Sequence, residues 1–143
     1  MRILVVHPGA SWILDSIAQK MSAAMPQVFS PWQCKPPMAG IGGAPPEGPW
    51  DGYYFCDVQN SWNPEWKRSF PDSLHVGLYT HLHESDPKNF RAGWEKLDGI
   101  CHMADLYRRI FEEQKFYPPE RMTVLRPGEV AGQFPLKKTK IGI

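Results

Sequence analysis

The chain of 143 residues has the length of one ordinary domain, which excludes two complete catalytic domains. Sixteen Lys and Arg residues balance fifteen Asp and Glu residues, and this net charge of +1 excludes strong electrostatic binding to nucleic acid or to an anionic membrane. The hydrophobic share of 42% suffices for a core, but no apolar run is long enough for a signal peptide or a transmembrane segment. Three cysteines without Cys-x-x-Cys spacing favour reduced thiols and a cytoplasmic protein.

The first third of the chain predicts a strand, a glycine turn and a helix. Residues 3–6 form a β-branched apolar run before Gly9, which is typical of a strand buried in a parallel sheet. Ser11 predicts a helix N-cap, and apolar residues recur at helical spacing over 13–21. Residues 31–49 are rich in proline, glycine and alanine, which predicts an irregular loop.

The rest of the chain predicts further strands separated by helices. The expected strands are 53–56, 75–80, 97–101 and 122–125, and the expected helices are 89–94 and 104–116. Strands that alternate with helices at this spacing predict a Rossmann-like three-layer αβα sandwich with a mostly parallel sheet. Residues 140–143 begin a new apolar run after a basic stretch, which indicates a truncated domain.

Polar residues follow three of the predicted strands, at the sheet edge where open α/β proteins bind ligands. They are Gly9, Ala10 and Ser11, then Asp57 to Asn60, then His81 to Asp86. Gly9 lets the backbone approach a ligand, and the helix start offers N–H groups to an anion. The alternative is a glycine that serves only the turn. Because the Gly-x-Gly-x-x-Gly fingerprint is missing, no nicotinamide or flavin cofactor is expected.

The segment His81-Leu82-His83, followed by Glu84, permits three interpretations. Two imidazoles on one face of an extended segment could ligate a metal, although only three other histidines exist to complete the site. One histidine could instead bind a hydroxylated substrate or act as its general base. In the third interpretation both are loop histidines, hydrogen-bonded to backbone and water.

Three of the six tryptophans, Trp12, Trp62 and Trp66, fall near the expected ligand edge. Aromatic faces suit the apolar C–H surfaces of sugar rings. Burial in the core is the alternative for each of them and the commoner role of a tryptophan.

Short motifs spread over almost the whole chain resemble a known family. They are Leu97-Asp98-Gly99-Ile100-Cys101, the amphipathic helix to Phe116, Pro119 to Leu125, Pro127-Gly128 followed by Phe134-Pro135, and Leu78-Tyr79-Thr80-His81. This pattern is similar to the N-terminal domain of GT-B-fold glycosyltransferases of the retaining, glycosyltransferase group 1-like kind. In that family an apolar strand leads to a Pro-Asn-Gly-Val-Asp turn and then to a Phe before the interdomain linker.

The resemblance implies a domain organisation and an activity. Residues 1–134 would form the Rossmann-like, acceptor-side domain, and residues 135–143 would hold the interdomain linker and the first strand of a missing second domain. The whole enzyme would transfer a sugar from a nucleotide-sugar donor to a glycan or other hydroxylated acceptor. Its own C-terminal domain would bind most of the donor, so the 143 residues alone would be inactive.

The resemblance also implies site residues. His81 would be the catalytic residue that contacts the transferred sugar, and no cofactor or metal would be required. The substrate-binding residues would be Gly9, Ala10, Ser11, Asp57, His83 and Glu84. Two alternatives stay open: a non-catalytic Rossmann-like domain that binds a small ligand or a protein, and a metal-dependent hydrolase that uses His81 and His83.

Overall fold

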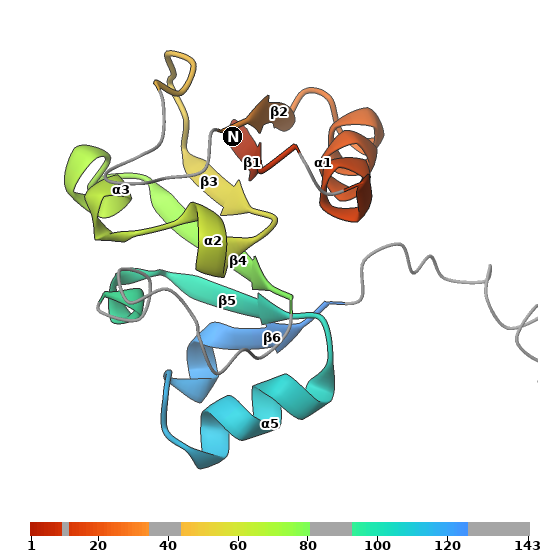
Figure 1. Ribbon diagram of the computed structural model, residues 1–143. Coiled ribbons are helices and arrows are strands. Elements are labelled where there is room, and N and C mark those ends of the chain that lie inside the picture. The colour runs from red at the N-terminus through yellow and green to blue at the C-terminus, as the bar shows by residue number, and fades with distance from the viewer. Residues whose placement is uncertain (10–11, 35–43, 81–92, 126–143) are drawn as a thin grey trace, which may run out of the picture.

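The computed structural model describes residues 1–9, 12–34, 44–80 and 93–125, which form one six-stranded parallel sheet flanked by helices (Figure 1). The strands are β1 (Ile3–His7), β2 (Phe29–Gln33), β3 (Gly52–Phe55), β4 (Leu74–Tyr79), β5 (Gly99–His102) and β6 (Met122–Val124). They lie in the order β2-β1-β3-β4-β5-β6, and every neighbouring pair is parallel. The predicted αβα sandwich with a parallel sheet is confirmed. Residues 126–143, with the expected linker and added strand, lie outside the described residues.

The helices pack on both faces of the sheet. They are α1 (Trp12–Ala24), α2 (Val58–Ser61), α3 (Pro64–Ser69) and α5 (Asp105–Glu113), with 3-10 helices η1 (Trp94–Lys96) and η2 (Pro119–Arg121). One apolar cluster joins Leu14 and Ala18 of α1 to Val5 and Cys56. A larger cluster on the other face contains side chains from β1, β3, β4, β5, α3 and α5, so the main core lies on the side opposite α1.

The prediction of an irregular loop from residue 31 was wrong at its start, because β2 continues to Gln33. Pro31 lies opposite Val5 in the parallel ladder, and β2 is the edge strand of the sheet. An edge strand tolerates proline, because one side of its backbone needs no ladder partner. The half-polar sequence Phe-Ser-Pro-Trp-Gln therefore forms a strand without looking like a buried one.

Two short helices between β3 and β4 were not predicted. Asn63 caps α3, accepting a hydrogen bond of 2.9 Å on its side-chain oxygen from the Glu65 backbone N–H, and Pro64 takes the first helical position. Of the expected helix 89–94 only residues 93 and 94 are described, and η1 begins at Trp94. Ser11, the expected N-cap of α1, lies outside the described residues.

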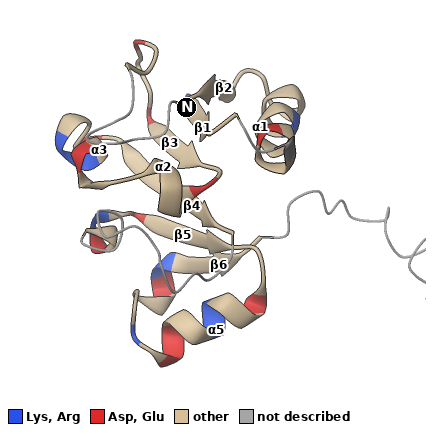
Figure 2. Ribbon diagram, viewed as in Figure 1, with Lys and Arg blue, Asp and Glu red and all other residues tan. Residues whose placement is uncertain are grey.

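Charged side chains lie on helices and loops, and none of the six strands contains Lys, Arg, Asp or Glu (Figure 2). All three cysteines are free and buried. None of the helices in the described ranges has the length and apolarity needed to cross a membrane.

Candidate functional site

The strand order reverses between β1 and β3, because β2 lies on one side of β1 and β3 on the other. Val6 of β1 is in register with Phe55 of β3, so the segments that follow the two strands leave the sheet side by side. Gly9 belongs to the first segment and Asp57 to the second. Such a reversal at the carboxyl ends of parallel strands is where open α/β sheets bind ligands. The structure therefore brings two of the expected substrate-binding residues to one edge.

The other expected site residues lie outside the described residues: Ala10, Ser11, His81, His83 and Glu84. Thr80, directly before His81, is described and follows β4 at the same edge. Its hydroxyl oxygen accepts a hydrogen bond of 3.1 Å from Gln59 Nε2, and Gln59 is buried on α2. This contact holds the end of β4 against the helix that follows Asp57.

Gly9 has a positive φ of 76°, in the left-handed region that disfavours side chains. A Cβ placed on Gly9 would overlap the side-chain amide of Gln33 at the end of β2. Glycine is therefore favoured at this position for two structural reasons, the positive φ of the turn and the close approach of the Gln33 side chain. They are independent of any ligand, so the geometry supports the turn interpretation and leaves the ligand role as a hypothesis.

Asp57 lies directly before α2 and is 9% exposed. Its carboxylate does not cap the helix. Instead both carboxylate oxygens accept hydrogen bonds from Asn60 Nδ2, at 3.2 and 3.0 Å. Asn60 is itself exposed, so the pair places a carboxylate and an amide together at the carboxyl edge. Hydrogen-bond acceptors and donors in this arrangement suit the hydroxyl groups of a polar ligand.

Two cysteines flank this carboxylate and stay protonated at neutral pH. Burial raises the pKa of Cys34, and the charge of Asp57 raises it further. The same two causes, with smaller effects from Asp15 and Cys34, raise the pKa of Cys56 to about 12. Since the thiolate is the reactive and metal-binding form, neither thiol is poised for nucleophilic or metal chemistry.

His7, the last residue of β1, lies at the same edge, although the sequence pattern did not mark it as a candidate. Its side chain is 5% exposed, and its Nδ1 lies 3.2 Å from Oδ1 of Asp15, in the first turn of α1. Burial lowers the pKa of His7, and the nearby Asp15 carboxylate partly opposes that shift. The imidazole is therefore neutral at pH 7. The only sequence signal was a polar residue at the end of an apolar run.

For Trp62 and Trp66 the sequence left two alternatives, stacking on a sugar ligand or the commoner burial in the core, and the structure shows burial for both. Both are buried in the main core, where Trp66 packs against Tyr53 and Phe55 with ring centroids 5.3 and 5.0 Å apart. Trp62 Nε1 donates a hydrogen bond of 3.2 Å to His75 Nδ1. The position of a residue after a strand determines where its backbone leaves the sheet, but it does not determine the direction of the side chain. Both indoles point into the main core, which packs over β3. The Trp12 side chain lies outside the described residues.

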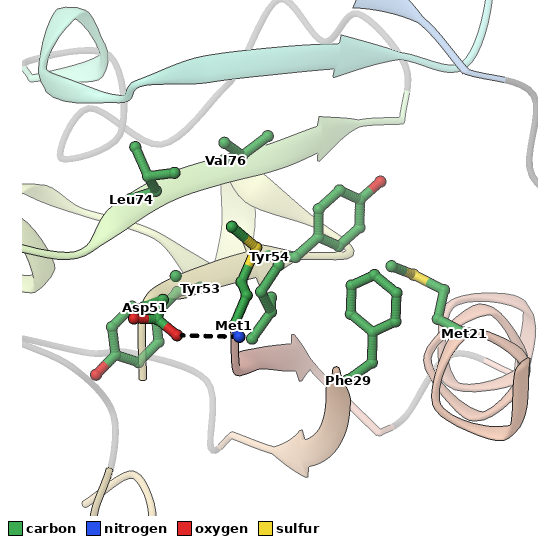
Figure 3. Close-up of a pocket in the computed structure, with 10 residues that line it drawn as sticks. Met1, Met21, Phe29, Asp51, Tyr53, Tyr54, Leu74 and Val76 are labelled. Atoms are coloured by element: carbon green, nitrogen blue, oxygen red, sulfur yellow. Dashed lines mark ion pairs between the residues drawn. The ribbon is translucent and has the colours of Figure 1, made fainter. Parts of the chain in front are cut away.

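The opposite end of the sheet carries an apolar pocket of about 280 Å³ (Figure 3). It is lined at the amino ends of the strands by residues such as Ile3, Phe29 and Leu74, with Met21 of α1. Its charged group, Asp51, is already engaged by the Arg2 backbone N–H at 2.7 Å and by the N-terminal amine at 4.0 Å. The pocket surface is almost wholly apolar although Tyr53, Tyr54 and Asp51 line it, so the more polar carboxyl edge is the better candidate for a hydroxylated ligand.

No metal centre is formed by the described part of the chain, where no three His, Cys, Asp or Glu side chains converge on a point. The metal interpretation depends on His81 and His83, which lie outside that part. No protein-family model, curated protein or solved structure matches the chain. The fold and site define a parallel αβα domain with a small polar site where the strand order reverses.

Proposed function

We propose that this chain is the N-terminal, acceptor-side domain of a two-domain GT-B glycosyltransferase, which transfers a sugar from a nucleotide-sugar donor to an acceptor hydroxyl. The observation that carries the proposal is the Asp57–Asn60 pair at the reversal between β1 and β3. It offers acceptor oxygens and an amide donor at the edge where parallel α/β sheets bind small molecules. The family resemblance of the flanking motifs supplies the reaction type, including retention of configuration. Buried, reduced cysteines favour a cytoplasmic enzyme.

Each site residue has a role in this proposal. Asp57 accepts hydrogen bonds from acceptor hydroxyls, and the turn at Gly9 brings backbone close to the substrate. His81 contacts the transferred sugar, by the family resemblance. The donor is held mainly by a second domain, and closure of the two domains excludes water from the reacting sugar.

The test is sugar transfer by the intact two-domain protein. Incubation with a panel of nucleotide sugars and glycan acceptors should release nucleoside diphosphate in step with acceptor glycosylation. His81→Ala should lower kcat, and Asp57→Ala should raise the KM for the acceptor. The matched control is Asp105→Ala, which removes a first-turn acid of α5 that is remote in sequence from the site. Undiminished transfer in His81→Ala would show that the catalytic assignment is wrong.

A non-catalytic ligand-binding domain is the second candidate, and the strand order favours it. The order β2-β1-β3-β4-β5 is that of flavodoxin-like domains, with β6 added at one edge. Those domains bind a ligand at the β1/β3 reversal without a second domain. Ligand binding by the 143-residue chain, with no sugar transfer by the intact protein under any donor, would favour this candidate over the enzyme.

A further inference from the structure

His7 and Asp15 form a histidine–carboxylate pair at the candidate site. His7 ends β1 and stands two residues before Gly9, while Asp15 comes from the first turn of α1. Asp15 Oδ1 lies 3.2 Å from His7 Nδ1. Two structural elements thus orient one imidazole at the point where the strand order reverses.

The carboxylate determines which ring nitrogen carries the proton. An ionised carboxylate only accepts hydrogen bonds, so a proton on Nδ1 is favoured beside Asp15 and the lone pair is left on Nε2. Nδ1 is buried and lies within ion-pair distance of Asp15, although the contact does not meet the geometry of a hydrogen bond. With the proton on Nδ1, Nε2 keeps its lone pair and is the ring atom that can accept a hydrogen bond.

The surroundings keep this acceptor neutral. The titratable groups nearest His7 in the fold include Asp15 from α1, Cys34 after β2, and Cys56 and Asp57 after β3. Only Asp15 among them shifts the pKa of His7, upward, and burial outweighs it. A neutral imidazole accepts a hydrogen bond from a hydroxyl group through its lone pair. Because it carries no positive charge, it does not attract a phosphate electrostatically.

We propose that His7 Nε2 accepts a hydrogen bond from a hydroxyl of the acceptor substrate, and that Asp15 is the positioning residue that sets the ring tautomer. This inference rests on the proposed function and deepens it by assigning the hydroxylated, uncharged substrate to the end of β1. The donor phosphates are then bound away from His7. Substrate binding weakens as the pH falls and Nε2 becomes protonated, because an imidazolium ring has no lone pair that can accept a hydrogen bond.

The first test uses no activity. Nitrogen-15 NMR of histidine-labelled protein should show His7 as the Nδ1–H tautomer in the wild type and in Asp105→Ala. In Asp15→Ala the population should move to the Nε2–H tautomer, and the pKa of His7 should fall further. Addition of D-glucose should shift the Nε2 resonance and lower the pKa, whereas inorganic phosphate should leave both unchanged. An Nε2–H tautomer in the wild type, or a response to phosphate and not to glucose, would overturn the proposal.

The second test separates the two ring nitrogens in the intact enzyme. His7→Gln places an amide oxygen near the Nε2 position and keeps an acceptor, while His7→Asn places its amide near Nδ1 and loses it. The KM for the acceptor should rise at least tenfold more in His7→Asn than in His7→Gln, with the KM for the donor unchanged in both. Equal effects of the two variants on both substrates would contradict the assignment. Absence of all transfer would instead count against the proposed function, and the NMR result would still decide the role of His7.

Discussion

Replacing His102 with leucine should flatten the acid dependence of the protein's stability. His102 ends β5, is fully buried, and contacts the rings of Tyr79 and Phe111 at centroid distances of 5.7 and 4.7 Å. Its Nε2 lies 3.3 Å from the Met122 sulfur, and its Nδ1 is buried without a hydrogen bond. Burial, helped by the charge of Arg108, lowers its pKa from 6.5 to about 4. The ring is therefore neutral in the folded state above about pH 4.

The size of the effect follows from that shift. Between about pH 6.5 and about pH 4 the unfolded chain binds a proton at this histidine and the folded chain does not. The contribution is therefore complete above pH 6.5 and is lost as the pH falls toward 4. At about 1.4 kcal/mol per pKa unit, His102 alone removes about 3 kcal/mol of unfolding free energy over this range. Burial also lowers the pKa of His7 and His75, which adds to the loss.

The assay is urea denaturation followed by tryptophan fluorescence, at several pH values across this range. At neutral pH His102→Leu should change the free energy of unfolding by less than about 1.5 kcal/mol, because it exchanges similar volumes and removes an unpaired nitrogen. As the pH falls toward 4, the unfolding free energy of the wild type should decrease by about 3 kcal/mol more than that of the variant. Parallel curves for the two proteins would refute the reasoning. NMR titration of wild-type His102 gives the same answer without the variant, and a pKa near 6.5 would refute it.

Three further substitutions test packing around the site. Gly9→Ala should lower the free energy of unfolding by at least about 1 kcal/mol, through the positive φ and the overlap with Gln33, and an unchanged urea midpoint would contradict both causes. Gly77→Ala should cost about 1–3 kcal/mol, because the new Cβ overlaps the Val58 side chain; a neutral result by thermal denaturation would mean that α2 shifts freely. Trp62→Phe should cost about 1–3 kcal/mol by leaving its buried histidine partner unpaired, and calorimetry showing no loss would remove that hydrogen bond from the account.

The parallel sheet was predictable because its central strands are buried on both faces. Residues 3–6 and 53–56 are continuous apolar runs, and residues 75–80 are uncharged and rich in apolar side chains. All three segments form strands within one or two residues of the expected bounds. The edge strand β2 escaped notice because its sequence contains proline and is half polar. Helices α2 and α3 span four and six residues, too short for the helical period to show.

The candidate site was predictable only in part. The rule that ligands bind beyond the carboxyl ends of strands located Gly9 and Asp57, since it needs only the order of elements. It could not reveal the His7–Asp15 pair, which depends on the distance at which α1 crosses β1. Nor could it show that Trp66 turns into the core, because chain position after a strand does not determine side-chain direction.

The location of bound substrate decides whether the carboxyl edge of the sheet is the binding site. Amide NMR spectra of the protein should be recorded with UDP-glucose or GDP-mannose, alone and together with a glycan acceptor. We expect the acceptor to shift the amides of His7, Gly9, Asp57 and Asn60 at the carboxyl edge, and to leave those of Phe29 and Leu74 at the apolar pocket unchanged. Shifts confined to the apolar pocket, or none with any of these ligands, would contradict this expectation.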